Sequence, residues 1–143
     1  MSTNLIQDTF QALAGGDPER IAAVLTEDAE WLSPPGNATA VALDAPHHMI
    51  GRPAIVRFFT EDFPRLFARD VALDVHRLHA DDEQAVLEAT MTATLADGRH
   101  YRNDYCFVVE IRDGLVHRVR EYTDTARGLR AVGQGSWTQM RPA

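Results

Sequence analysis

The chain has 143 residues, a formal net charge of −7 and a hydrophobic content of 45%. These values indicate one globular domain with a substantial core. An acidic surface repels nucleic-acid phosphates and anionic lipids, so we expect neither nucleic acid nor a membrane as a partner. The single cysteine, Cys106, cannot form an internal disulfide. Together with the lack of a signal or membrane-spanning apolar run, it favours a cytoplasmic location.

The N-terminal half shows helical periodicity in three places. Expected helices cover residues 4–14, a segment from Asp17-Pro18 and a segment from Pro53. Gly15-Gly16 ends the first helix, and the second begins where aspartate and proline favour a helix start. A short strand is expected at residues 29–32. The segment from 33 to 49 is rich in proline and is expected to be an irregular loop that carries function.

From Val71 onward the apolar residues alternate with polar ones, which is typical of β-strands. Residues 84–95 alternate strictly, and Asp97-Gly98 and Asp113-Gly114 indicate tight turns between strands. The C-terminal half therefore predicts a meander of long antiparallel strands. We expect one domain over residues 1–126 and a loosely held tail over residues 127–143.

Three stretches carry a family resemblance: Gly-Asp-Pro-Glu-Arg-Ile at 16–21, Gly-Arg-Pro-Ala-Ile-Val-Arg-Phe-Phe at 51–59, and Arg-Asp-Gly-Leu-Val-His-Arg-Val-Arg-Glu-Tyr-Thr-Asp at 112–124. With this order of elements, residues 4–126 resemble the SnoaL-like branch of the nuclear transport factor 2-like superfamily. The resemblance implies an α+β cone of the cystatin-like kind, in which three N-terminal helices pack in the concave face of a curved antiparallel sheet. The fold alone does not specify a reaction.

The residue set of the ketosteroid isomerases is missing. By counting along the motifs, their base aspartate falls at Ser33, their phenolic donor at Thr9 and their protonated aspartate at Phe107. The resemblance therefore does not imply steroid isomerisation by that mechanism.

The set of the limonene-epoxide hydrolases is also incomplete. Its arginine falls at Glu88, its first aspartate at Thr90 and its second at Glu121, so a single carboxylate remains. Polyketide cyclases of the SnoaL type are similar more loosely. They use a carboxylate as general acid and base without a cofactor, and Glu121 is the nearest counterpart.

Glu121 is accordingly the expected catalytic residue, because burial against aromatic walls would raise its pKa towards neutrality. The alternative is a solvated glutamate paired with Arg118 or Arg120. Tyr105 and Asn103 share a strand face and are expected to stabilise a substrate oxygen. They could instead satisfy each other or backbone groups in the core.

The expected substrate-binding residues are aromatic or polar and come from several elements: Trp31, Ser33, Phe59, Phe63, Glu88, Thr90, Tyr101 and Phe107. The roles of His47 and His48 in the loop stay open. No metal-binding pattern appears, since His76 and His79 would face opposite sides of a strand, and no cofactor motif is present.

The resemblance places the threonines of residues 84–95 inside the cone, which would leave the apolar side of this strand outside. That side carries Leu87, Ala89, Met91 and Ala93, and Cys106 and Val108 are expected to extend it on the neighbouring strand. An exposed face of this kind needs a partner. We therefore expect a homodimer through the outer sheet face.

The expected function is a cofactor-independent isomerase, cyclase or lyase acting on a small, mostly apolar carbonyl compound. The alternatives are a module that binds a small apolar ligand without chemistry and a structural dimer with a filled cone.

Overall fold

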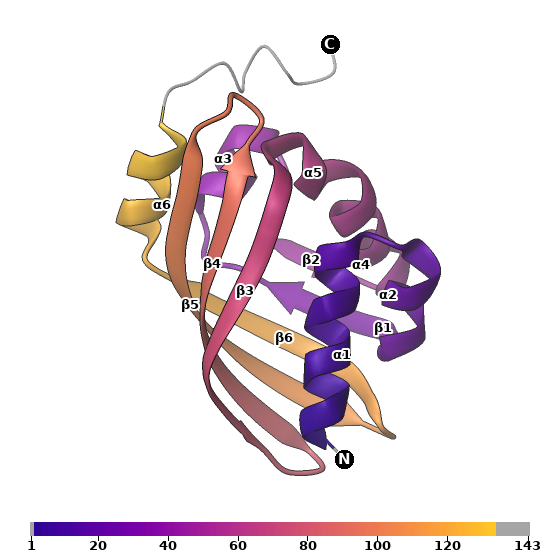
Figure 1. Ribbon diagram of the computed structural model, residues 1–143. Coiled ribbons are helices and arrows are strands. Elements are labelled where there is room, and N and C mark those ends of the chain that lie inside the picture. Colours follow the sequence, from indigo (N-terminus) through magenta and orange to yellow (C-terminus); the bar gives the residue numbers. More distant parts are fainter. Residues whose placement is uncertain (1, 134–143) are drawn as a thin grey trace.

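The computed structural model describes residues 2–133, which form a curved six-stranded sheet with helices on its concave side (Figure 1). The elements are α1 (Ser2–Gly15), α2 (Pro18–Val24), β1 (Leu25–Leu32), α3 (Ala38–Leu43), β2 (His48–Ile50), α4 (Arg52–Arg57), η1 (a π-helical turn, Phe58–Asp62), α5 (Phe63–Leu66), β3 (Phe67–Ala80), β4 (Gln84–Leu95), β5 (His100–Arg112), β6 (Leu115–Thr123) and α6 (Thr125–Val132).

The helices begin where the sequence predicts. The side chain of Asp17 accepts a hydrogen bond from the backbone N–H of Glu19, and Pro18 occupies the first turn of α2. Helix α4 begins beside Pro53 and continues through η1 into α5. Helix α5 ends at Leu66, and the long strand β3 begins at Phe67.

The strand order is β2-β1-β6-β5-β4-β3. Strands β3 to β6 form the expected antiparallel meander. Strand β1 runs parallel to β6, with Trp31 opposite Val119. The α+β class is confirmed, but the sheet is mixed rather than antiparallel throughout. The difference is possible because β1 and β6 are joined by most of the chain rather than by a hairpin turn.

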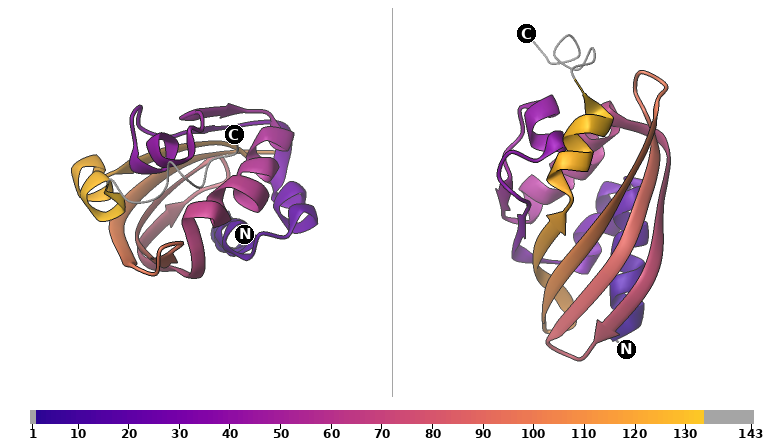
Figure 2. Two further views of the ribbon diagram at one scale, coloured as in Figure 1. Left: turned by 90° about the horizontal axis from the view of Figure 1, so that it is seen from above. Right: turned by 90° about the vertical axis from the view of Figure 1, so that its left-hand side faces the viewer.

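The two faces of β4 are the reverse of the arrangement that the resemblance implied. Leu87, Ala89 and Met91 are buried on the concave side, whereas the side chain of Glu88 is exposed on the other side. The apolar side of the strand packs against the chain's own core, as burial of apolar surface favours. Figure 2 shows from above how the sheet curves around the helices.

Two short helices were not expected. Helix α3 lies within the predicted loop 33–49, and strand β2 begins in this loop and ends at Ile50. Helix α6 begins at Thr125 and continues into the region expected as tail. Asn37 and Asp124 cap these helices by accepting backbone hydrogen bonds. Of the tail predicted at 127–143, residues 127–132 belong to α6, and residues 134–143 lie outside the described part. No helix in residues 2–133 is long and apolar enough to cross a membrane.

Candidate active site

A cavity of about 90 Å³ lies between the concave face of the sheet and the helices. It exceeds the ~10–15 Å³ that one water molecule needs. Much of its wall is aromatic: Phe10, Trp31, Phe58, Phe59, Phe63, Phe67, Tyr105 and Phe107. The polar residues without an aromatic ring on this wall are Ser33, Asn37, Thr39 and Glu121.

Among the described residues that line the cavity, Glu121 is the only one with a carboxyl group. Its Oε1 accepts a hydrogen bond from the indole Nε1 of Trp31 at 3.2 Å. Burial raises the pKa of Glu121 from about 4.5 to about 7, and hydrogen bonds from Trp31 and Ser33 oppose the rise. A carboxyl group with this pKa can both accept and donate a proton near neutral pH.

The parallel pairing of β1 with β6 brings these groups together. Trp31 lies opposite Val119, and Ser33 and Glu121 each follow two residues later. Side chains two residues apart in a strand share a face. Alternation along the two paired strands therefore explains why Glu121, Trp31 and Ser33 surround one cavity, as expected.

Tyr105 lines the same cavity from β5. It lies opposite Thr123, whereas Phe107 lies opposite Glu121, so Tyr105 and Glu121 are diagonal neighbours on one face. Burial raises the pKa of the Tyr105 phenol well above its ordinary value, and the nearby phenol of Tyr101 and carboxylate of Glu121 add to this. Tyr105 is thus a protonated hydrogen-bond donor at neutral pH.

The aromatic wall is built from close ring contacts. The rings of Tyr105 and Phe107 are stacked at 5.6 Å, and Trp31 meets Phe59 edge-on at 5.1 Å. Phe63 contacts the ring of Phe59 at 5.5 Å. Such contacts hold the side chains in defined positions. All four residues expected as aromatic walls, Trp31, Phe59, Phe63 and Phe107, line the cavity.

Asn103 and Tyr101 lie behind this wall rather than on it. Asn103 has no exposed surface, and Tyr101 is 2% exposed. The hydroxyl groups of Tyr101 and Tyr105 are 2.7 Å apart, and the amide of Asn103 donates to the Tyr101 oxygen at 3.3 Å. The expected direct contact of Asn103 with a substrate is wrong for this arrangement, because its amide is used within the protein.

Glu88 and Thr90 lie on the opposite face of the sheet from the cavity. The side chain of Glu88 is 55% exposed and lies 3.9 Å from Arg77. Thr90 donates to Asp104 at 2.7 Å and is 2.7 Å from Nε2 of His76. Their expected place in the substrate site is wrong, because the inward positions of β4 are the apolar ones.

The same finding removes the basis for the expected dimer interface. The chain itself buries the side that carries Leu87, Ala89 and Met91. Cys106 and Val108 lie opposite Glu88 and Val86, and so belong to the other face. The oligomeric state stays a prediction that no contact within this chain addresses.

The loop histidines lie outside the cavity wall. His47 is exposed, and Nε2 of His48 lies 2.8 Å from a carboxylate oxygen of Glu30. Within residues 2–133, no group of three or more histidine, cysteine, aspartate or glutamate residues could hold a metal ion.

Sequence reasoning missed several lining residues. Asn37, Thr39 and Ala40 reach the cavity from α3 and its N-cap, and Met91 and Leu73 reach it from the sheet. The alternation of β4 already placed Met91 on the apolar side. The capping residue Asn37 before an apolar run was the signal for α3.

A curved sheet around an aromatic-walled cavity with one carboxyl group is the architecture of the cone fold. The chain belongs to the SnoaL-like domain family, whose model matches residues 6–119. A search of curated proteins found no match.

Solved structures agree with this assignment. A putative ketosteroid isomerase from Kribbella flavida is 30% identical, with a TM-score of 0.63, and the match covers 85% of this chain and 76% of that one. An NTF2-like protein of unknown function from Burkholderia pseudomallei is 20% identical, with a TM-score of 0.77 and coverage of 91% and 95%. An LEH-like epoxide hydrolase from M. tuberculosis is 17% identical, with a TM-score of 0.71 and coverage of 90% and 86%. The last two likenesses concern the fold alone.

Proposed function

We propose that this protein is a cofactor-independent isomerase, cyclase or lyase that acts on a small, mostly apolar carbonyl compound, with Glu121 as general acid and base. The observation that carries the proposal is a carboxyl group with a pKa of about 7 in an apolar cavity, beside a phenol that stays protonated. Such a pairing of titratable groups suits proton transfer near neutral pH.

The reaction begins with the ionised form of Glu121. The carboxylate removes a proton from the carbon next to the substrate carbonyl, and the electron pair of that C–H bond moves to the carbonyl oxygen as an enolate. The protonated Glu121 then returns the proton to the same or another carbon. In a cyclase the enolate carbon forms the new bond, and in a lyase it expels a group on the next carbon.

Tyr105 stabilises the developing negative charge on the oxygen. Its hydroxyl donates a hydrogen bond to the enolate from the face that also holds Glu121. Because the pKa of Tyr105 is raised, the phenol keeps its proton while it donates. The aromatic wall excludes water and binds the apolar remainder of the substrate.

Inward-facing residues of β4 argue against an epoxide hydrolase of the known type. The positions that could supply an arginine and an aspartate are Leu87, Ala89 and Met91. The chemistry therefore rests on one carboxyl group rather than on a charged set.

The test is hydrogen–deuterium exchange at the carbon next to the carbonyl. A panel of small ketones is incubated in heavy water with the protein, and exchange is followed by proton NMR. We expect catalysed exchange for at least one apolar ketone. Glu121→Gln should slow it by about 10²- to 10⁴-fold, the usual contribution of a general base. Glu88 carries a carboxylate on the opposite face of the same sheet, so the control variant Glu88→Gln should leave the exchange rate unchanged.

Two results would contradict the proposal. Binding of ketones without exchange would favour the non-catalytic binding module. Exchange that Glu121→Gln leaves intact would remove Glu121 from the chemistry.

A further inference from the structure

Helix α6 lies beyond residues 6–119, which the family model matches, and contacts β5 and α3. Figure 1 shows it beside β5 at the left of the view, with α1 at the right. It packs against the residues behind the cavity wall. A Cβ atom added to Gly128 would lie 3.3 Å from Nδ2 of Asn103 and 3.8 Å from the hydroxyl of Tyr101.

Every polar atom of the Asn103 side chain has a partner. Nδ2 donates to the backbone carbonyl of Asp124 at 3.0 Å and to the hydroxyl of Tyr101 at 3.3 Å, and Oδ1 accepts from the backbone N–H of Asp104 at 2.9 Å. The carbonyl of Asp124 needs a donor and the N–H of Asp104 needs an acceptor. The orientation of the amide is therefore fixed, and Asn103 must donate to Tyr101.

The direction of the next hydrogen bond follows. The oxygen of Tyr101 accepts from Asn103, and the Tyr101 hydroxyl is buried with Tyr105 as its other hydrogen-bond partner. A buried hydroxyl group donates its proton wherever an acceptor is in reach. Tyr101 therefore donates to Tyr105. The proton of Tyr105 is then left for another acceptor, which is either the neighbouring Thr123 hydroxyl, itself a donor to the carbonyl of Asp104, or a group in the cavity.

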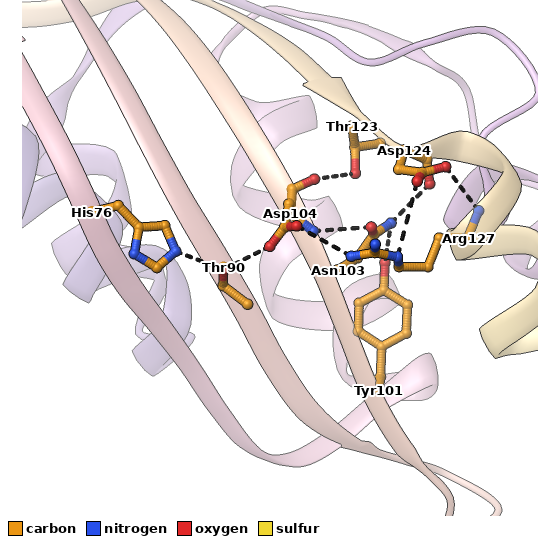
Figure 3. Close-up of polar contacts among 8 residues, drawn as sticks. All are labelled: His76, Thr90, Tyr101, Asn103, Asp104, Thr123, Asp124 and Arg127. Carbon is orange, nitrogen blue, oxygen red and sulfur yellow. Dashed lines mark hydrogen bonds and ion pairs between the residues drawn. The ribbon is translucent and has the colours of Figure 1, made fainter.

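Charged contacts hold α6 in this place. Nη1 of Arg127 lies 3.1 Å from Oδ2 of Asp104, and the Asp124 side chain accepts from the backbone N–H of Arg127 at 2.9 Å. Figure 3 shows how Asp104 connects this anchor to Thr90 and His76 on the outer face, and how Asn103 connects it to Tyr101.

We propose that α6 and Asn103 act together as a positioning device that keeps the hydroxyl proton of Tyr105 away from Tyr101 and so leaves it available to an acceptor in the cavity. Asn103 is then a positioning residue that acts through Tyr101, rather than a catalytic one. This proposal rests on the proposed function in one respect: the group that accepts the hydrogen bond from Tyr105 is taken to be a substrate oxygen.

The test uses carbon-13 at Cζ of the tyrosines and needs no substrate, so its failure is independent of any failure of Glu121 to catalyse. Three signals are expected, from Tyr101, Tyr105 and Tyr122, and single Tyr→Phe variants assign them. A phenol that loses an accepted hydrogen bond becomes electronically more like tyrosinate, and its Cζ signal moves in that direction.

In Gly128→Ala the added methyl displaces the Asn103 amide, so the Tyr101 signal should move towards the tyrosinate position while the Tyr122 signal stays. Gly15→Ala is the matched control, because its added Cβ meets nothing within 4 Å. It should leave the signals unchanged. If Gly128→Ala does not fold, Asn103→Asp makes the same test, since a carboxylate keeps the shape of the amide but cannot donate.

Tyr101→Phe tests the direction of the hydrogen bond between Tyr101 and Tyr105. The Tyr105 signal should move towards the tyrosinate position, because Tyr105 loses a bond that it accepts. A move in the opposite direction, or none, would overturn the proposed direction. An unmoved Tyr101 signal in folded Gly128→Ala or Asn103→Asp would overturn the role of α6 and Asn103.

Discussion

Replacing Glu121 by glutamine should change the stability of the protein relative to the unmodified protein in a pH-dependent way. The change should favour the variant more at neutral and alkaline pH than at acid pH. Glutamine keeps the shape of the side chain and can still accept from Trp31, but it does not ionise. In the folded protein the pKa of Glu121 is about 7. In the unfolded chain its pKa is the ordinary value of about 4.5. The stability contributed by the protonated form is complete below the unfolded pKa and is lost as the pH rises through the folded pKa.

The size of the effect follows from the pKa shift. Each unit corresponds to about 1.4 kcal/mol, so a rise from about 4.5 to about 7 corresponds to about 3 kcal/mol. The free energy of unfolding of Glu121→Gln, minus that of the unmodified protein, should therefore rise by about 3 kcal/mol between these pH values. Above about pH 7 the difference should level off.

The assay is urea denaturation, followed by circular dichroism, from about pH 4.5 to about pH 8.5. Glu88→Gln controls for the loss of one carboxylate on the same sheet. A difference for Glu121→Gln that stays flat across the range would show that the cavity does not disfavour the charged carboxylate, and the argument for an acid–base site would fail.

Trp31→Phe should raise the pKa of Glu121 further, because the lost indole N–H favours the ionised carboxylate. Carbon-13 NMR of the labelled glutamates measures this pKa, and a fall would contradict the assignment. Met91→Asp places a charge in the buried cavity wall and should cost at least about 3 kcal/mol of unfolding free energy. Thr92→Asp, whose position faces the other side of β4, should cost less than about 1 kcal/mol in the same urea titration. Equal costs would mean that the sheet faces are assigned wrongly.

Elements with strong local signals could be predicted from the sequence. Asp17-Pro18 marks the start of α2, and the turns at Asp97-Gly98 and Asp113-Gly114 set the register of β5 and β6. Alternation along β5 placed Tyr105 on the inward face, and Glu121 was placed by counting along the family motif from Gly114. The parallel pairing of Trp31 with Val119 could not be read from the sequence, because no local rule selects a strand partner so far along the chain.

The errors have physical explanations. For β4, apolar alternation predicted the correct inner face, and the family resemblance reversed it. In a strand a displacement of one residue is enough to move every side chain to the opposite face, so counting along the motifs could not fix the faces of β4. Helix α6 was missed because Gly128 weakens its helical pattern. A Cβ atom at that position would crowd the amide of Asn103 at 3.3 Å.

The bond between Trp31 and Glu121 joins residues that are 90 positions apart. Strands β3 to β6 are connected in sequence, so the meander closes short loops, whereas β1 must find β6 across most of the chain. We therefore expect the docking of β1 to follow formation of the meander during folding. Until then Glu121 lacks the buried surroundings that disfavour its charge. Between about pH 4.5 and about pH 7, completion of the fold should accordingly take up one proton from solution, so acid should favour this last folding step.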